Sequence, residues 1–150
     1  MMKKLSLYIF LVLMFCNLAN TSKAEENLYK INIDGMKRLN GEKISNLLAN
    51  KKINFYHKDG NGGHYYAEET HSLNGDFYQN SKVLAEVTGE WKVQDNTLCY
   101  KYDEHGPIGE WKKEWEADKE FVCDIYIYSK NNNYYFVNNE EEIYAKIIFK

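Results

Sequence analysis

The sequence is poor in several residue types, and each shortage excludes a class of protein. Its 150 residues include one proline and nine glycines, which excludes collagen-like chains and low-complexity linkers. Arg38 is the single arginine and the formal net charge is −3, so we expect no nucleic-acid partner, because such binding depends on neutralising phosphates. After the first 24 residues, no apolar run approaches the roughly 20 residues that a membrane-spanning helix needs.

Sequence signatures of common catalytic sites are also missing. The chain has no Gly-x-Ser-x-Gly motif of a hydrolase nucleophile and no His-Glu-x-x-His zinc motif. A glycine-rich stretch at residues 59–63 joins two predicted strands, so it lacks the helix N-terminus that stabilises a bound phosphate. The sequence therefore favours a non-enzymatic protein and indicates no cofactor.

The N-terminal 24 residues have the three-part pattern of a secretory signal peptide. Residues 1–4 are positively charged, residues 5–15 are apolar, and Ser22 and Ala24 are the small residues expected before a cut after Ala24. Cleavage leaves 126 of the 150 residues, and the loss of three lysines changes the formal net charge from −3 to −6. We expect a periplasmic or secreted protein with no integral membrane span after cleavage. Retention of the apolar segment as an anchor is the alternative.

The cysteines fit export. Cys16 lies within the signal peptide, and its lipidation is an alternative that bulky Phe15 disfavours, because lipoprotein cleavage needs small residues before the cysteine. Removal of the signal leaves Cys99 and Cys123, and an even count in a small exported domain favours a disulfide. Closing a loop of this length stabilises the fold by about 3.5 kcal/mol in the chain-entropy account. A redox pair or a zinc site would need closer spacing or more ligands.

After a polar lead-in at residues 25–38, the sequence predicts one short helix. Asn40 is a suitable N-cap, and Ile44, Leu47 and Leu48 fall on one stripe at helical spacing. A helix of about ten residues is unstable alone and needs tertiary packing. We therefore expect it to cover a sheet face or to plug one end of a barrel.

Beyond the helix, the hydrophobic period changes to two. The clearest segment is 83–93, which places Val87, Gly89, Trp91 and Val93 on one face and polar residues on the other. Turn residues separate this segment from others of similar length. The predicted strands are 53–58, 64–69, 76–79, 83–93, 97–102, 121–128, 134–137 and 143–149.

Seven to eight short strands after one helix predict a mainly β fold with a minor α contribution. The regular turn signals favour an antiparallel meander that closes into a small barrel or curls strongly. About 126 residues are enough for one domain. The predicted organisation is a signal peptide at 1–24, a lead-in at 25–38 and a single β-rich domain at 39–150.

Residues 103–120 interrupt the strand pattern. Pro107 suits a first helical turn, and Ile108, Trp111 and Trp115 follow on one helical face. One interpretation is a short amphipathic helix that covers the sheet or a barrel mouth. A lid or an aromatic contact site is the second, with Trp111 and Trp115 as candidate binding residues, and a further strand pair is the third.

Two of the four histidines, His57 and His64, flank the first predicted hairpin turn. If they face each other across it, they can bind a divalent metal together with Asp59 or Glu68. Simple solvation of both rings is the alternative. Glu68 and Glu69 cannot act together as acid and base on one substrate, because neighbours in a strand point to opposite faces.

Twelve tyrosines remain after removal of the signal, and many are paired or alternate along predicted strands. Tyr100 and Tyr102 are two residues apart, so they share one face of their strand. A tyrosine combines a large ring with a polar tip, which suits contact with a small ligand or a protein. Packing of these rings on a twisted sheet, with no role in binding, is the alternative interpretation. Tyr100 and Tyr102 are therefore candidate binding residues.

One succession of motifs extends over much of the chain: Leu39-Asn40-Gly41-Glu42-Lys43-Ile44 with Leu47-Leu48, then Gly89-Glu90-Trp91-Lys92-Val93, Leu98-Cys99-Tyr100 and Cys123. It resembles the helix and the Gly-x-Trp-x-Val…Leu-Cys…Cys strands of a group of small exported proteobacterial proteins of unknown function. The resemblance covers residues 39 to 137 and implies a short helix before a run of strands, but no activity. The segment 103–120 departs from that group's short link. Gly-x-Trp is also similar to a lipocalin motif, but lipocalins carry it where the barrel opens, so ligand binding is not carried over.

Together these features predict an exported cell-envelope protein that acts as a non-enzymatic binding or interaction domain through aromatic side chains. Its partner would be an unidentified small ligand or an envelope protein. The alternatives are a metal-dependent hydrolase that uses His57 and His64 with nearby carboxylates, and a structural envelope protein. An open interior lined by tyrosine and histidine would favour binding, whereas a filled interior would favour the structural alternative.

Overall fold

The structure is a computed structural model, and it describes residues 26–82, 85–103 and 118–148. The predicted signal peptide and the candidate residues Trp111 and Trp115 lie outside this part of the chain. The elements in chain order are η1 (Leu28–Lys30), β1 (Lys37–Arg38), α2 (Gly41–Leu48), β2 (Lys51–Lys58), β3 (His64–His71), β4 (Asp76–Ser81), β5 (Ala85–Gln94), β6 (Thr97–Tyr102), β7 (Val122–Lys130), β8 (Asn133–Val137) and β9 (Ile143–Ile148).

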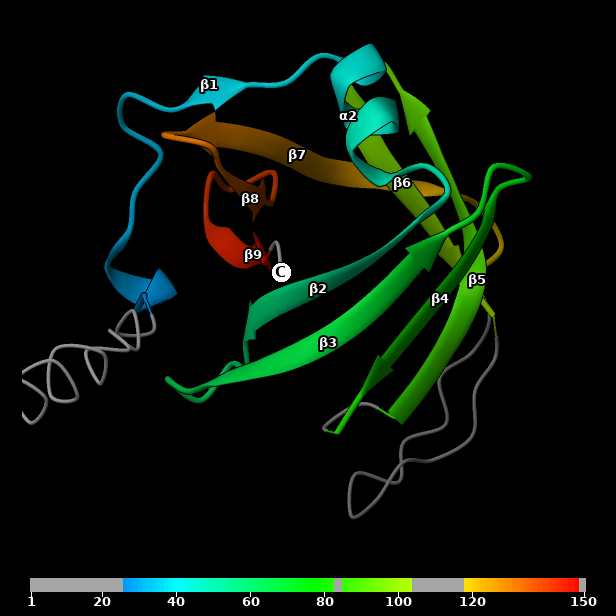
Figure 1. Cartoon of the computed structure of the whole chain (residues 1–150), viewed down its shortest axis with the longest axis horizontal. Helices are drawn as coiled ribbons and strands as arrows, with labels where there is room; N and C mark the ends of the chain where they lie inside the picture. Colours follow the sequence, from blue (N-terminus) through cyan, green and yellow to red (C-terminus); the bar gives the residue numbers. More distant parts are fainter. Residues whose placement is uncertain (1–25, 83–84, 104–117, 149–150) are drawn as a thin grey trace, which may run out of the picture.

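Strands β2 to β9 form a closed antiparallel barrel (Figure 1). Each of these strands pairs with the next one in the chain, and β9 pairs with β2 to close the circle. Every barrel strand therefore has two neighbours, which removes the exposed edges of an open sheet. The short strand β1 pairs with Tyr128 and Ser129 of β7, beyond the part of β7 that pairs with β6. The predicted mainly β fold and its antiparallel meander are confirmed, and of the two predicted alternatives the meander forms the closed barrel.

The predicted alternation of residues 83–93 is confirmed in β5. Val87, Gly89 and Trp91 are buried, whereas the residues between them are exposed. Gly89 lies opposite Tyr102 of β6, and a side chain at this position would collide with the carbonyl oxygen of Lys101. Glycine therefore permits the close approach of the two strand backbones.

Helix α2 lies across one end of the barrel. Asn40 caps it as predicted, because the Asn40 Oδ1 atom accepts a hydrogen bond of 3.0 Å from the backbone N–H of Lys43. Ile44 and Leu48 are fully buried and join the interior core, which also contains Phe55 of β2. The helix contacts β2, β5 and β6. This half of the barrel interior is therefore filled by packed side chains.

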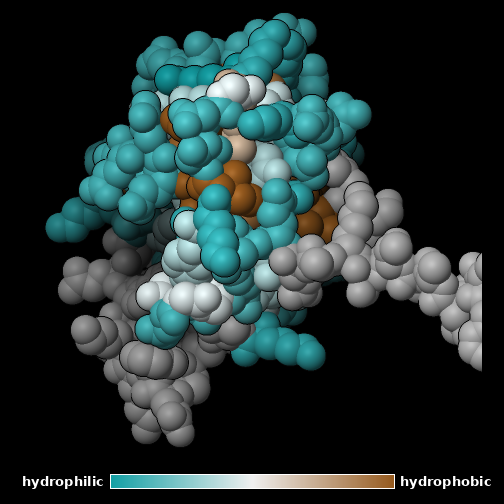
Figure 2. Space-filling model, turned by 90° about the vertical axis from the view of Figure 1, so that its left-hand side faces the viewer, coloured by the Kyte–Doolittle hydropathy of each residue, from teal (hydrophilic) through white to brown (hydrophobic). Residues whose placement is uncertain are grey.

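The lead-in packs against the outside of the barrel and forms a second, smaller core. Leu28 of η1 is fully buried in this cluster, which includes Tyr56 of β2 and Tyr135 of β8. Half-buried Ile31 and Ile33 pack against the same cluster. Figure 2 views the molecule from the left-hand side of Figure 1 and shows apolar side chains in the middle of a mostly hydrophilic face. From Leu28 onward, the lead-in is therefore packed onto the barrel.

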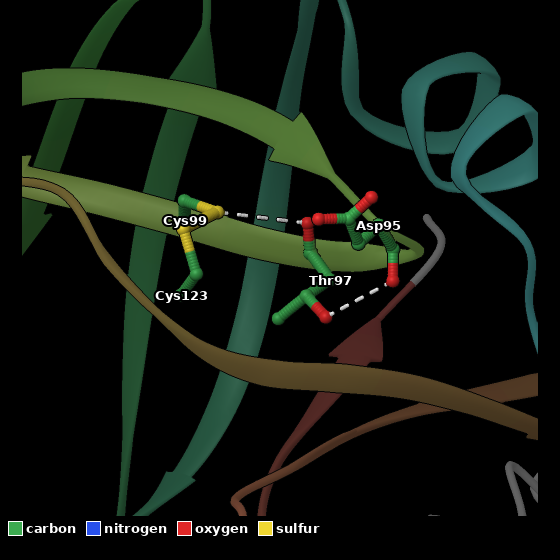
Figure 3. Close-up of a disulfide and its surroundings, with 4 residues drawn as sticks. All are labelled: Asp95, Thr97, Cys99 and Cys123. Carbon is green, nitrogen blue, oxygen red and sulfur yellow. Dashed lines mark hydrogen bonds between the residues drawn. A yellow bond between two sulfur atoms is a disulfide. The ribbon is translucent and has the colours of Figure 1, made fainter.

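A disulfide joins Cys99 of β6 to Cys123 of β7, as predicted, with the two Cα atoms 4.1 Å apart (Figure 3). The pairing of Leu98 with Ile125 and of Tyr100 with Val122 leaves one extra residue in β7 at this point. The resulting β-bulge places Cys123 on the outer side, although Ile125 faces inward. The bond thus fastens the two strands that the long segment 103–121 connects.

The disulfide generates a stability prediction. Replacing both Cys99 and Cys123 by serine should lower the free energy of unfolding by roughly 2–5 kcal/mol, because the unfolded chain regains the entropy of a loop with a sequence separation of 24. Urea denaturation of the two proteins measures this difference. The wild type in reductant is the control and should unfold at the midpoint of the double variant. Equal midpoints for the oxidised wild type and the double variant would contradict the prediction.

Candidate functional site

A cavity of about 240 Å³ lies inside the barrel. Its lining includes His57 and Lys58, which end β2, whereas α2 packs near the beginning of that strand. The cavity therefore occupies the half of the barrel away from α2. The remaining polar groups in its lining belong to Glu69 and Gln79, apart from the tyrosine hydroxyls. Six aromatic side chains form most of the wall: Tyr65, Phe77, Tyr100, Tyr102, Phe136 and Tyr144.

Strand β3 supplies the acidic group of this cavity. Side chains alternate along β3, so that Ala67, Glu69 and His71 are buried while Tyr66 is 51% exposed. Glu69 lies opposite Gln79 of β4, and both residues are buried. The register of the sheet therefore aims a glutamate into the barrel.

Glu69 is 3% exposed and is surrounded by polar partners. Its Oε1 atom accepts a hydrogen bond of 3.2 Å from the Nε2 atom of Gln79. The Nε2 atom of His57 lies 3.3 Å from the same oxygen, and the Nε2 atom of His71 lies 3.8 Å from Oε2. Neither histidine has hydrogen-bond geometry toward the carboxylate: among the described residues, Glu69 Oε2 and His57 Nε2 have no hydrogen-bond partner.

Burial of the Glu69 carboxylate in this arrangement is expected to lower the stability of the fold. A buried carboxylate loses its hydration, and it is tolerated when hydrogen bonds or opposite charges replace the lost water. Here one oxygen has a donor and the other, Glu69 Oε2, has none among the described residues. Buried polar atoms without partners are uncommon in folded proteins and call for an explanation. The free oxygen therefore marks the cavity as a candidate site.

His71 and Tyr100 form the boundary between the cavity and the packed half of the barrel. The Nε2 atom of fully buried His71 and the hydroxyl of Tyr100 share a hydrogen bond of 2.7 Å. The imidazole also packs against Phe77 and Trp91, with ring centroids 5.2 and 5.1 Å away. Burial lowers the pKa of His71 to about 4, although the charge of Glu69 acts in the opposite direction. His71 is therefore a neutral imidazole at pH 7.

The tyrosines in the cavity lining carry neutral hydroxyl groups. Burial, followed by the charges of Glu69 and Asp59, raises the pKa of Tyr65 to about 12. Burial also raises the pKa of Tyr102, with Glu69, then Asp118 and Asp124, adding to the rise. Each hydroxyl keeps its proton at neutral pH. The wall therefore offers hydroxyl groups and π surfaces, but no phenolate charge.

A second β-bulge brings Tyr144 into the cavity. Phe136 of β8 lies opposite Ala145 of β9, whereas Val137 lies opposite Ile143, so one extra residue is inserted in β9. That residue is Tyr144, which lines the cavity. Its ring centroid lies 6.0 Å from that of Phe136. The bulge therefore re-aims a side chain toward the candidate site.

The structure brings two of the sequence-predicted binding residues together. Tyr100 and Tyr102 both line the cavity, with nearly parallel rings whose centroids are 5.6 Å apart. It separates the two candidate metal ligands, because His57 points inward while His64 stacks on the outward ring of Tyr56 at 4.7 Å. Register explains this: His57 lies opposite Tyr65, not opposite His64. Within the described residues, no group of three or more His, Cys, Asp or Glu side chains is placed to hold a metal ion.

Most of the cavity lining was missed from sequence, including its acidic residue Glu69, the amide of Gln79 and the ring of Tyr144. The sequence predicts that side chains alternate along residues 64–71. Both faces of this strand carry a glutamate, a histidine and a tyrosine, so hydrophobicity does not show which face is buried. For Tyr144 no sequence signal exists, because its inward direction depends on the bulge in β9.

Comparison with protein-family models, curated protein sequences and solved structures found no match. In the ranges that the structure describes, no helix has the length and apolar character needed to cross a bilayer. The candidate site therefore has to be interpreted from its own geometry.

Burial of His71 predicts a pH dependence of stability. Its folded pKa of about 4 lies below the ordinary value of 6.5, so between these values the unfolded chain binds a proton that the native chain does not. Stability should therefore fall as the pH decreases from 6.5 to 4, by up to roughly 3 kcal/mol from this group. Urea denaturation at a series of pH values measures the slope.

The variant His71→Gln keeps a hydrogen-bonding group beside Tyr100 but does not titrate. Its stability should lack the part of the slope that belongs to His71, because the remaining titrating groups are the same in both proteins. Parallel stability curves for the wild type and the variant between pH 7 and pH 4 would show that His71 does not contribute.

Proposed function

We propose that this protein is an exported, non-enzymatic binding protein that holds a small ligand inside its barrel. One observation carries the proposal: the interior contains a cavity of about 240 Å³ lined by buried Glu69, a carboxylate whose Oε2 atom has no hydrogen-bond partner among the described residues. The signal-like N-terminus and the disulfide between Cys99 and Cys123 support export.

The size of the cavity supports a ligand below drug size. Ligand pockets for drug-sized molecules range from about 300 to 1,000 Å³, and an engineered apolar cavity of about 150 Å³ takes up benzene. At about 240 Å³, this cavity lies between these cases. A single aromatic ring with a short polar side chain therefore fits the available volume.

The composition of the lining also resembles that of ligand sites in general. Such sites are mostly apolar and aromatic, with a few polar groups that orient the ligand. Here six aromatic rings surround Glu69, Gln79 and His57. The interior is open and lined by tyrosine and histidine, which favours binding over a purely structural role. The separation of His57 from His64 gives no support to the metal-dependent hydrolase.

A cavity-filling variant tests this proposal with 2-phenylethanol as the probe. Saturation of the wild type with the probe should raise its melting temperature, because a ligand that binds only the native state stabilises it, by about 2.7 kcal/mol at 100 times the dissociation constant. Val87 lines the cavity, so Val87→Phe should fill the space and abolish the shift.

The matched control is Thr88→Phe, the same enlargement at the adjacent, exposed position of β5. This variant should respond to 2-phenylethanol as the wild type does. Circular dichroism checks that both variants keep the β structure. A wild type that shifts with neither 2-phenylethanol nor 2-phenylethylamine, or a folded Val87→Phe protein with an undiminished shift, would contradict binding in the cavity.

A further inference from the structure

We propose that the ligand of this cavity is a protonated primary amine with a small aromatic or apolar body. The ammonium group would contact Glu69, and the body would pack against the surrounding rings. This inference rests on the proposed function, because it names the class of molecule that occupies the same cavity.

The charge of the cavity favours a cation. Among the described residues, Glu69 is the one acidic residue of the lining and Lys58 is its one lysine. The Nζ atom of Lys58 lies 4.7 Å from the ring centre of Tyr29, a residue of η1 outside the barrel. Its ammonium group is therefore directed away from the cavity. Within the part of the chain that the structure describes, an anion beside Glu69 would meet a carboxylate with no lysine or arginine directed into the cavity to compensate it.

Three further carboxylates add to the negative potential near the cavity. Asp59 acts on the hydroxyl of Tyr65, and Asp118 and Asp124 act on that of Tyr102. Tyr65 and Tyr102 both line the cavity. A cavity lined by low-dielectric walls focuses such a potential, and a field of one sign raises the local concentration of ligands of the opposite sign.

The hydrogen bonds of Glu69 favour an N–H donor. Oε1 already accepts from Gln79, while Oε2 has no partner among the described residues. A primary ammonium group carries three N–H donors, so it can donate to the Glu69 carboxylate and keep donors for further acceptors in the lining. Hydrogen bonds in which the donor or the acceptor is charged are about twice as strong as neutral ones, and here the ion-pair attraction adds to them. A quaternary ammonium ion has the charge but not the donors.

The aromatic walls suit the rest of such a ligand. Phe77 lies beside Tyr100, with centroids 4.6 Å apart, and Tyr100 stacks on Tyr102. Phe136 and Tyr144 line the same space. The faces of aromatic rings attract cations within about 6 Å of their centroids and also bury apolar groups. These rings can therefore attract the ammonium group of an arylalkylamine and bury its aromatic ring.

A series of four probes with similar bodies tests the proposal on the wild type by isothermal titration calorimetry at pH 7. The probes are 2-phenylethylamine, neutral 2-phenylethanol, anionic phenylacetate and the quaternary cation benzyltrimethylammonium. The amine should bind at least tenfold more tightly than the alcohol and the quaternary cation, because only it combines charge with N–H donors. Phenylacetate should show no binding, because of Glu69.

The variant Glu69→Gln identifies the group responsible. It removes the charge but keeps the shape, so the affinity for the amine should fall at least tenfold, to that of the alcohol, while the affinity for the alcohol stays within twofold. Glu68→Gln is the matched control, because Glu68 is the neighbouring residue of β3 on the outer face, where it pairs with Lys52 at 2.7 Å. This control should bind all probes as the wild type does.

The possible results of these titrations distinguish failure of the amine inference from failure of the proposed function. Alcohol binding as tight as amine binding, or equal amine affinity in Glu69→Gln and the wild type, would overturn the amine inference and leave a binding cavity in place. Equal affinity for the quaternary cation would overturn the need for an N–H donor. Failure of both the amine and the alcohol to bind would overturn the proposed function itself. The wild-type series decides between these outcomes even if Glu69→Gln does not fold.

Discussion

The burial of the Glu69 carboxylate inside a closed barrel is the constraint on which the rest of the interior depends. A carboxylate at this position needs donors, and the neighbouring strand supplies one through Gln79, while His57 and His71 approach the same group from two sides. The same carboxylate raises the pKa of tyrosines in the cavity wall, secondary to their burial. Glu69 Oε2 still lacks a hydrogen-bond partner among the described residues, and the proposed ligand would supply the missing donor.

One half of the barrel interior is packed and stabilises the fold, and the other half contains the candidate site. Near α2, Ile44 and Leu48 pack with the strand side chains and fill the space. In the other half, Tyr100, Tyr102 and Tyr144 leave a cavity of about 240 Å³ around Glu69. The lead-in and the disulfide hold the barrel from outside, at the outer core and at the β6–β7 pair. Outer reinforcement of this kind compensates for a core that is not filled throughout.

The sequence was sufficient for those features that depend on local pattern. The cap at Asn40, the alternation in β5 and the pairing of Cys99 with Cys123 follow from residue type, period and count, and all three are confirmed. Tyr100 and Tyr102 were placed on one face for the same reason. Features that depend on the pairing register of distant strands could not be predicted from the sequence. The inward direction of Glu69 depends on pairing with β2 and β4, and that of Tyr144 depends on an inserted residue opposite β8.

The most direct test of this account observes the Glu69 carboxyl group itself during binding. Carbon-13 NMR of protein labelled at the glutamate Cδ atoms, with the Glu69 resonance assigned by its loss in Glu69→Gln, reports on each carboxyl separately. On titration with 2-phenylethylamine, the Glu69 resonance should shift along a saturable curve, while that of Glu68 on the outer face stays in place. A Glu69 resonance that does not move while the amine binds would contradict the account, because the ligand would then lie elsewhere.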